Sequence, residues 1–417
     1  MTDFEKTIRE AVTAGREAET RFLAELVKVP SDNPPGDCVA HAERAAQLLE
    51  GLDFTVERHP VPRETVEAAG MIAATNLVVR RKFGAQGDKG PVVALNAHGD
   101  VVPPGEGWTK DPYGAEVADG WMYGRGVAVS KSDFATYTYA LLALESAVKA
   151  GATLNGTVEL HFTYDEEAGG EIGPRWLLDQ GISKPDLSIG AGFSYNVATA
   201  HNGCLHLEVT VSGKSAHAAK PFTGHDALEA ATAILTTLYD WRKRLSDRVS
   251  DIEGIGSPQC TVGLIEGGIN TNVVPDKVTL RLDRRMIPEE DPAAAEQELR
   301  DLIEGAVRNR EGIKVQIRRI LLAAPLMPLD GGQRLVDCLS ERATQVMGGR
   351  VGAMGVPLYT DARHYTAAGV PTVLYGAGPR SIEEANAHRA DERLPLADLC
   401  KATEVVALTL YDLLKSG

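Results

Sequence analysis

The sequence predicts an α/β fold in which a mostly parallel sheet, flanked by helices, is interrupted by an inserted α+β sandwich. The continuous apolar run at 91–95 is typical of a strand buried on both faces of a parallel sheet, and a second strand is expected at 157–163. Helical patterns alternate with such runs in the first half of the chain and again near its end. Between these regions the alternation stops. We therefore expect one domain formed by 1–203 and 324–417 and a second domain formed by 204–323.

Each expected element follows from local periodicity and from the residues that interrupt it. The helices expected in the larger domain are 4–28, 39–52, 132–150, one from about 173, 333–347 and 396–414. Its expected strands are 55–57, 76–81, 92–96, 157–163 and 372–375. The helices expected in the inserted domain are 227–245 and 292–308, and its strands are 205–211, 260–265, 277–282 and 314–318.

Composition is that of a globular protein from a reducing compartment. Of the 417 residues, 43% are hydrophobic and 24% are charged, and no apolar run is long enough to cross a bilayer. The polar opening 1–6 lacks the features of a signal peptide, so we expect a cytoplasmic protein with no membrane partner. Five cysteines without a Cys-x-x-Cys pair argue against a disulfide framework and a thiolate zinc site. A net charge of −15 argues against a nucleic-acid partner.

A histidine and an aspartate stand where the strand after Pro91 should end. In open α/β sheets, sites form beyond the carboxyl ends of the strands, and His98-Gly99-Asp100 occupies that place. In an extended chain, His98 and Asp100 point to the same side. The carboxylate could then accept a hydrogen bond from one imidazole nitrogen and leave the other for a metal. Taken alone, His-x-Asp is also a common polar pair at a strand end.

Consecutive acids follow the second apolar strand, and a histidine stands near the end of the chain. Asp165-Glu166-Glu167 could be a solvated turn, or one carboxylate could bind a metal while its neighbour moves a proton. His388 precedes a predicted helix start, where a single histidine is commonly structural.

The order and spacing of these segments resemble the metallohydrolase family that includes carboxypeptidase G, aminoacylase, acetylornithine deacetylase and succinyl-diaminopimelate desuccinylase. The resemblance spans nearly the whole chain. The segments that carry it are 98–103, 108–112, 123–126, 165–167, 213–218, 272–275, 283–285, 360–364 and 387–388. It implies a catalytic, metal-binding domain formed by 1–203 and 324–417, and a lid and dimerisation domain formed by 204–323.

The resemblance assigns roles to individual residues of the catalytic domain. It implies that His98 is a metal ligand oriented by Asp100, and that Glu166 is the general base that activates water. Glu167 and His388 match the ligands of the family's second metal.

Further roles are implied for three residues of the lid domain, and Arg363 of the catalytic domain is a fourth candidate. His217 matches a histidine that family dimers supply across the interface to polarise the scissile carbonyl, which implies a homodimer. Asn272 and Arg285 match residues that grip the substrate, and Arg363 could hold its carboxylate or nitro oxygens. From the residues alone, His217 could equally cap a turn, and Arg285 could equally pair with Asp283 on a strand face.

The sequence departs from the family pattern at two metal positions. The bridging aspartate after Gly-Arg-Gly falls on Val129, and a second carboxylate position falls on Gly192, or on Ala191 if the alignment slips by one. Without the bridging carboxylate, two nearby cations would repel strongly. We therefore expect one divalent ion, manganese or zinc, held by the ligands His98, Glu167 and His388. Asp133 could substitute for the missing bridge, or Ser132 could cap a helix with Asp133 in its first turn.

These residues predict a metal-dependent hydrolase of a C–N bond in a small carboxylated substrate. Two substrate classes stay open: an aromatic amine resembling 5-nitroanthranilate, the substrate of a one-metal branch of the family, and an N-acyl amino acid. An alternative of another class is a binding protein that has lost catalysis on the same scaffold. The retained pairing of a base with metal ligands argues against this alternative.

Overall fold

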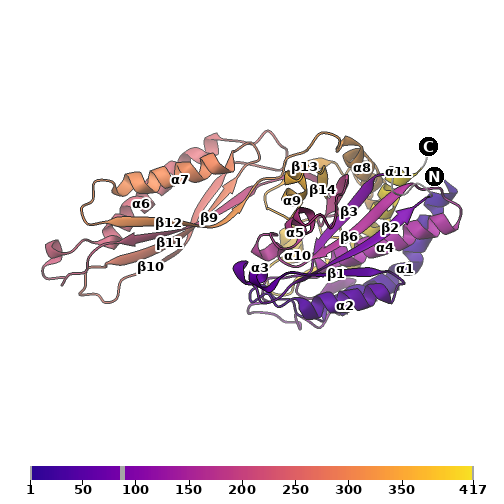
Figure 1. Ribbon diagram of the computed structural model, residues 1–417, viewed down its shortest axis with the longest axis horizontal. Helices are drawn as coiled ribbons and strands as arrows, with labels where there is room; N and C mark the ends of the chain where they lie inside the picture. The colour runs from indigo at the N-terminus through magenta and orange to yellow at the C-terminus, as the bar shows by residue number, and fades with distance from the viewer. Residues whose placement is uncertain (1, 85–89, 416–417) are drawn as a thin grey trace. The chain divides into compact units, whose positions relative to one another are not determined.

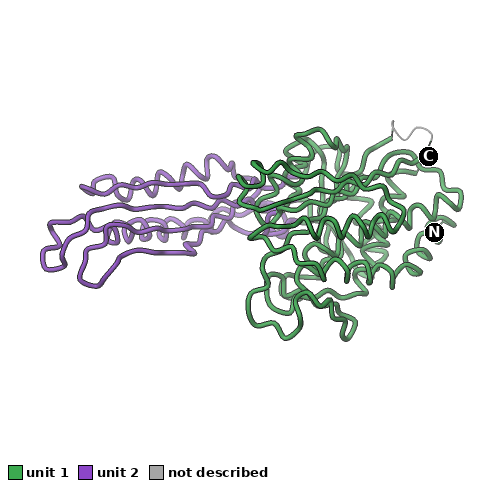
Figure 2. The backbone as a smooth tube through the Cα atoms, turned by 60° about the horizontal axis from the view of Figure 1, so that its bottom comes forward, with its two compact units in different colours: residues 1–199, 328–354, 360–417 green, residues 200–327, 355–359 purple. Residues whose placement is uncertain are grey.

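The computed structural model describes residues 2–84 and 90–415, which form two compact units (Figure 2). Unit 1 comprises Met1–Thr199, Pro328–Met354 and Thr360–Gly417, and unit 2 comprises Ala200–Met327 and Gly355–Tyr359. Among the residues that the structure describes, none of the helices combines the length and apolar character that a membrane span requires.

An eight-stranded sheet forms the centre of unit 1 (Figure 1). Its strands, in spatial order, are β1 (Val56–Pro60), β2 (Thr75–Phe83), β6 (Gly156–Thr163), β3 (Val92–His98), β7 (Leu187–Gly190), β14 (Thr372–Leu374), β8 (Val197–His201) and β13 (Ala353–Val356). The four central strands β6, β3, β7 and β14 are parallel, whereas β1 and β2 are antiparallel additions. The predicted mostly parallel α/β sheet is confirmed.

Helices cover both faces of this sheet, as the apolar strand sequences require. On β3, Val93 and Leu95 face the main core, whereas Ala94 packs with Tyr365 on the opposite face. The main core includes α1 (Asp3–Val27), α2 (Val39–Glu50), α4 (Lys131–Lys149), α8 (Gln333–Met347) and α11 (Leu396–Leu414). The opposite face is covered by α5 (Pro174–Asp179) and α9 (Ala362–Ala367). A strand buried on both sides therefore needs no polar alternation.

Short elements complete unit 1. They are α3 (Arg63–Ala68), α10 (Ile382–Ala385) and a three-stranded sheet of β15 (Arg393–Pro395), β5 (Trp121–Tyr123) and β4 (Glu116–Ala118). The helix expected from about residue 173 is short and ends at Asp179. The long helices begin and end close to the predicted bounds because their apolar faces are continuous.

Unit 2 is a four-stranded antiparallel sheet with two helices on one face (Figure 1). The strand order is β10 (Gln259–Gly267), β11 (Lys277–Met286), β9 (Gly203–Ser212) and β12 (Lys314–Ala323). The helices α6 (Ala227–Arg242) and α7 (Pro292–Val307) pack on apolar residues such as Leu205 and Leu207. Because successive strand residues point to opposite faces, Cys204 and His206 lie on the other face.

Candidate active site

Two neighbouring parallel strands bring the two principal motifs together. β3 and β6 pair with His98 directly opposite Thr163. Beyond the strand ends, the Gly99 N–H donates to the Thr163 carbonyl oxygen at 2.8 Å. The short 3-10 helix η2 (Glu166–Ala168) starts soon after β6 ends. The histidine motif and the acid motif therefore meet at the carboxyl edge of the sheet, as is general for open α/β folds.

Asp100 is the centre of this arrangement. Its buried carboxylate accepts hydrogen bonds from the backbone N–H groups of Glu166 and Glu167, each at 3.2 Å, and from the Asn33 side-chain amide at 3.0 Å. Nδ1 of His98 lies 3.0 Å from the Asp100 carbonyl oxygen and 3.4 Å from its Oδ1. Asp100 thus fixes both the imidazole and the start of η2. Asn33 was not found from the sequence, because it lies far from the motif along the chain.

Glu166 is a largely buried acid beside the imidazole of His98, with 15% of its side chain exposed. Its Oε2 lies 3.9 Å from Nε2 of His98, the nitrogen that does not face Asp100. Burial raises the pKa of Glu166 well above its ordinary value; the charge of His98 opposes this rise, and Glu167 adds to it. A carboxylate with such a pKa can accept and return a proton near neutral pH.

Glu167 and His388 form a second pair at this edge. Oε1 of Glu167 lies 3.4 Å from Nε2 of His388, and this interaction raises the pKa of the imidazole. His388 adopts a φ of 60°, a left-handed conformation that is uncommon for residues other than glycine. Such conformations concentrate at functional sites, where the surrounding structure enforces them.

The predicted ligands His98, Glu167 and His388 lie in these two pairs and not in one tight cluster. Within 2–84 and 90–415, the only group of three His, Cys, Asp or Glu residues whose ligand atoms all lie within 4.8 Å of one another is in unit 2. One ion bound by all three predicted ligands would therefore require their side chains to move. Two imidazoles and neighbouring carboxylates are nevertheless donors that suit a divalent transition metal.

Two further buried aspartates, Asp165 and Asp361, lie close to this edge and strengthen the fit to a cation. Within the described part of the chain, Oδ1 of Asp165 and Oδ2 of Asp361 are buried without a hydrogen-bond donor. Burial and the charge of Glu166 raise the pKa of Asp361 above its ordinary value. A buried carboxylate oxygen without a partner is costly unless a proton or a cation offsets its charge. Both aspartates stand inside motifs read from the sequence, yet neither was given a role.

Arg363 lies within this acid cluster. Its side chain is buried, contacts Nε2 of His364 and donates to the Gly169 carbonyl oxygen. Its charge opposes the raised pKa values of Glu166 and Asp361. The guanidinium therefore balances buried carboxylates, and its expected contact with substrate stays a prediction.

The segment that lacks the bridging aspartate is held by Glu392. This buried carboxylate accepts hydrogen bonds from the Arg125 guanidinium at 2.6 Å and from the N–H groups of Gly126, Ala128 and Val129 at 3.0–3.3 Å. Glu392 was not found from the sequence, since it lies in a different segment near the end of the chain. It fixes the backbone of the loop, while the Val129 side chain offers no donor atom.

Gly192, where the family pattern places a carboxylate, and Asp133, a possible substitute for the bridging aspartate, lie in different environments. At Gly192, an added Cβ would lie 2.9 Å from backbone atoms of Leu374 and Tyr375, so this position has no room for a side chain. Asp133 lies in the first turn of α4, as expected, but Ser130 and not Ser132 is the N-cap residue. The Asp133 carboxylate accepts the Ala377 N–H at 2.8 Å, and burial raises its pKa to about 7.

His217 and Asn272 lie on neighbouring exposed loops of unit 2. His217 forms a β-bridge with Val273, and the Ala218 N–H donates to the Asn272 carbonyl oxygen at 2.9 Å. The Ala219 N–H donates to Nδ1 of His217 at 3.0 Å, and this bond does not use Nε2. The turn contact considered from the sequence is thus present, and it still leaves one imidazole nitrogen for another partner.

Arg285 pairs with Asp283 on the face of the unit 2 sheet. Its Nε and Nη2 donate to the two carboxylate oxygens at 2.9 and 3.0 Å, and its guanidinium lies 5.7 Å from the centre of the Tyr359 ring. The strand-face pairing considered from the sequence is therefore observed. The expected role of Arg285 in substrate binding stays a prediction.

Comparisons with known proteins agree with this geometry. The sequence model of peptidase family M20/M25/M40 matches residues 94–412. A succinyl-diaminopimelate desuccinylase of Gluconacetobacter diazotrophicus is 28% identical and aligns over 97% of this chain and 99% of its own length. An acetylornithine deacetylase of Myxococcus xanthus is 28% identical over 87% of this chain and 89% of its own length.

Solved structures show the same fold at lower identity. An M20 family metallo-carboxypeptidase from Sulfolobus solfataricus superposes with a TM-score of 0.74 at 18% identity, over 94% of this chain and 98% of that one. A dinuclear metal-binding peptidase of the M20 family from Bacillus subtilis superposes with a TM-score of 0.67 at 18% identity, over 96% and 99%. The fold with an inserted lid domain is thereby confirmed.

Proposed function

Because the chain belongs to peptidase family M20/M25/M40 and is a metal-dependent hydrolase, we propose that it cleaves the amide bond of a small, carboxylated N-acyl amino acid. Relatives that align over most of the chain are named as a desuccinylase and a deacetylase. The observation that carries the proposal is the position of Glu166. Asp100 holds this largely buried acid beside Nε2 of His98, the nitrogen proposed to bind the metal.

The site residues of unit 1 have separate proposed roles in hydrolysis. A bound divalent ion would polarise the scissile carbonyl and lower the pKa of water. Asp100 keeps His98 in one orientation through its carbonyl oxygen, so Nε2 stays available as a ligand. Glu166 accepts a proton from the attacking water and returns it to the leaving nitrogen, which its raised pKa favours. Glu167 and His388 would supply the remaining ligand atoms for this ion.

We propose that one ion, manganese or zinc, is sufficient. Val129 and Gly192 offer no carboxylate at the two positions where the family pattern places one, and Gly192 has no room for a side chain. The solved relative from Bacillus subtilis is described as dinuclear, so a count of one ion would distinguish this chain from that protein. Elemental analysis after dialysis should show that the double substitution His98→Ala and Glu167→Gln removes about one ion per chain relative to wild type, and a loss of two ions would contradict the proposal.

The aromatic candidate stays a prediction without support from these relatives, which are named for removing succinyl and acetyl groups. A substrate panel decides between the two classes. The metal-loaded enzyme should hydrolyse N-succinyl or N-acetyl amino acids and should leave aminobenzoates unchanged, with a metal-stripped sample as the control. Release of ammonia from a nitro-substituted aminobenzoate would reverse the assignment. Absence of turnover on the whole panel would favour the binding protein.

We further propose a homodimer in which His217 acts in the partner's site. The edge strand β10 supports this proposal, because it exposes Leu264 and Ile265 and has an open row of backbone groups. Glu166→Gln and His217→Ala should each be inactive alone. Mixing the two variants under conditions that exchange subunits should restore activity, since one site of the mixed dimer then has both residues. Absence of rescue despite exchange would exclude this role.

A further inference from the structure

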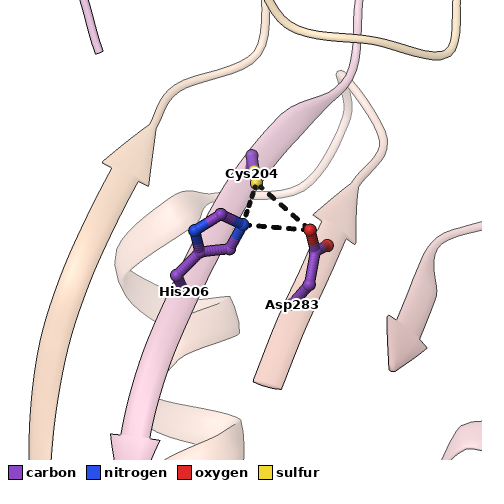
Figure 3. A group of neighbouring side chains, drawn as sticks. All are labelled: Cys204, His206 and Asp283. Atoms are coloured by element: carbon purple, nitrogen blue, oxygen red, sulfur yellow. Dashed lines mark hydrogen bonds and ion pairs between the residues drawn. The ribbon is translucent and has the colours of Figure 1, made fainter. Parts of the chain in front are cut away.

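A cysteine, a histidine and an aspartate converge on the face of the unit 2 sheet that carries no helix (Figure 3). Sγ of Cys204 lies 3.3 Å from Nε2 of His206 and 3.9 Å from Oδ2 of Asp283. Nε2 of His206 lies 3.0 Å from the same Oδ2. We propose that Cys204, His206 and Asp283 form a second metal site, which binds a divalent ion of borderline softness such as Zn²⁺.

Strand register creates this convergence. Cys204 and His206 are two residues apart on β9, so their side chains leave the sheet on the same face. On β11, Asp283 is directly opposite His206, and Arg285 is directly opposite Cys204. Directly opposite residues have Cβ atoms only about 4.5–5.5 Å apart. The sheet thus places a sulfur, a nitrogen and an oxygen donor together without any Cys-x-x-Cys spacing.

The distances suit a tetrahedral ion. With Zn–S near 2.3 Å and Zn–N or Zn–O near 2.0–2.1 Å, ligand atoms of a tetrahedral site lie about 3.3–3.6 Å apart. The three observed separations, 3.0, 3.3 and 3.9 Å, bracket this range. An ion could therefore be bound after side-chain adjustments of a few tenths of an ångström. Mixed sulfur and nitrogen donors select zinc-like ions over magnesium or calcium.

The arrangement favours an ion over a nucleophilic thiol. In a Cys-His-Asp relay, the acid binds one imidazole nitrogen while the thiol binds the other. In this cluster the thiol and the carboxylate both approach Nε2 of His206, which is the convergence that a shared cation produces.

The surroundings leave one coordination position open. Cys204 is fully buried, whereas the side chains of His206 and Asp283 are 34% and 31% exposed, so solvent reaches one side of the cluster. Arg285 already donates to both oxygens of Asp283. A carboxylate offers about four acceptor positions, so Asp283 can retain this guanidinium and still bind an ion. Three protein ligands with an open position are typical of reactive or exchangeable zinc sites and not of closed structural ones.

Cobalt titration of the full-length protein tests the proposal. Metal-stripped wild-type protein should bind Co²⁺ with a thiolate-to-cobalt charge-transfer band, because Cys204 is the sulfur ligand. Cys204→Ala should abolish this band and lower the number of bound Zn²⁺ ions by one per chain, while Cys338→Ala, on α8, should leave both unchanged. His206→Gln provides a second variant and should weaken Zn²⁺ binding at this site at least about tenfold.

Two results would overturn the proposal. One is a wild-type protein that shows no thiolate band at saturating Co²⁺. The other is a folded Cys204→Ala or His206→Gln variant that binds as many Zn²⁺ ions as wild type, and as tightly. Circular dichroism of each variant identifies those that fold.

Discussion

The acid cluster of unit 1 and the cysteine cluster of unit 2 differ in the source of their charge balance. In unit 1, Asp100 is held by backbone N–H groups and by the neutral amide of Asn33, and several neighbouring carboxylates have raised pKa values that the charge of Arg363 only partly opposes. In unit 2, Asp283 is paired with Arg285 on the same sheet face. A surplus of buried negative charge draws a cation strongly, whereas a paired carboxylate shares its oxygens with a guanidinium. We therefore expect tight metal binding in unit 1 and weaker, exchangeable binding in unit 2.

The largest effect is expected at Glu166. Glu166→Gln keeps the size of the side chain and removes its ability to accept a proton, so turnover should fall about 10²- to 10⁴-fold. The metal content and the thermal unfolding midpoint should stay close to those of wild type. The matched control is Glu64→Gln on α3, where the side chain is exposed. Steady-state kinetics with metal analysis measure both, and a variant with near-normal turnover would remove Glu166 from the mechanism.

A buried acid outside both clusters shows how burial without a bound metal ion changes the pKa of a carboxyl group and the stability of the fold. Glu19 on α1 is buried, accepts a hydrogen bond from Thr403, and has a pKa that burial raises to about 8. Its protonated form stabilises the folded state fully below the ordinary pKa of about 4.5, and this stabilisation is lost as the pH rises through about 8. Glu19→Gln should remove this dependence and raise the free energy of unfolding above pH 8 by a few kcal/mol.

Urea unfolding of the wild type and Glu19→Gln between pH 5 and pH 9 measures the effect. The difference in unfolding free energy between the two proteins should change progressively across this range. Glu17→Gln is the control, because Glu17 lies on the same helix but is exposed. A pH-independent difference for Glu19→Gln would mean that this carboxyl ionises normally in the folded protein.

Paired ligand substitutions test the independence of the two clusters. Glu167→Gln should weaken metal binding in unit 1, and Asp283→Asn should weaken it in unit 2, each by at least about tenfold. Each variant should leave the other site unchanged, because the two carboxylates lie in different units. Isothermal titration with Zn²⁺ resolves the two affinities. If both substitutions weakened the same one of the two Zn²⁺ affinities, the two clusters would not be independent metal sites.

The acid cluster was largely predictable from the sequence because it follows from topology. Strands were expected at 92–96 and 157–163, and parallel neighbours share a carboxyl edge, so the motifs that contain His98 and Glu166 were expected to meet. The partners that hold the site were not predictable. Asn33 and Glu392 reach it from distant segments and have no local pattern that identifies them.

The cysteine cluster escaped sequence analysis for a different reason. Cys204 and His206 lie on one strand and Asp283 on its neighbour, so their proximity depends on antiparallel register and not on sequence spacing. A shift of one residue would turn Asp283 to the opposite face. The short strands β4, β5 and β15 were missed as well, because three residues carry too little periodicity to identify a strand.

The smallest effect is expected at Asn33, whose side-chain amide donates a hydrogen bond to Asp100. Within residues 2–84 and 90–415, His98 is the only other residue whose side chain contacts this carboxylate as a donor. Asn33→Ala removes a neutral donor to a buried carboxylate, which should cost about 1.5 kcal/mol of unfolding free energy. Turnover should fall less than in Glu166→Gln, since the backbone N–H groups still hold Asp100. Asn309→Ala, at an exposed position of unit 2, is the control. Thermal and urea unfolding measure the loss, and an unchanged stability would show that the backbone N–H groups alone hold the carboxylate.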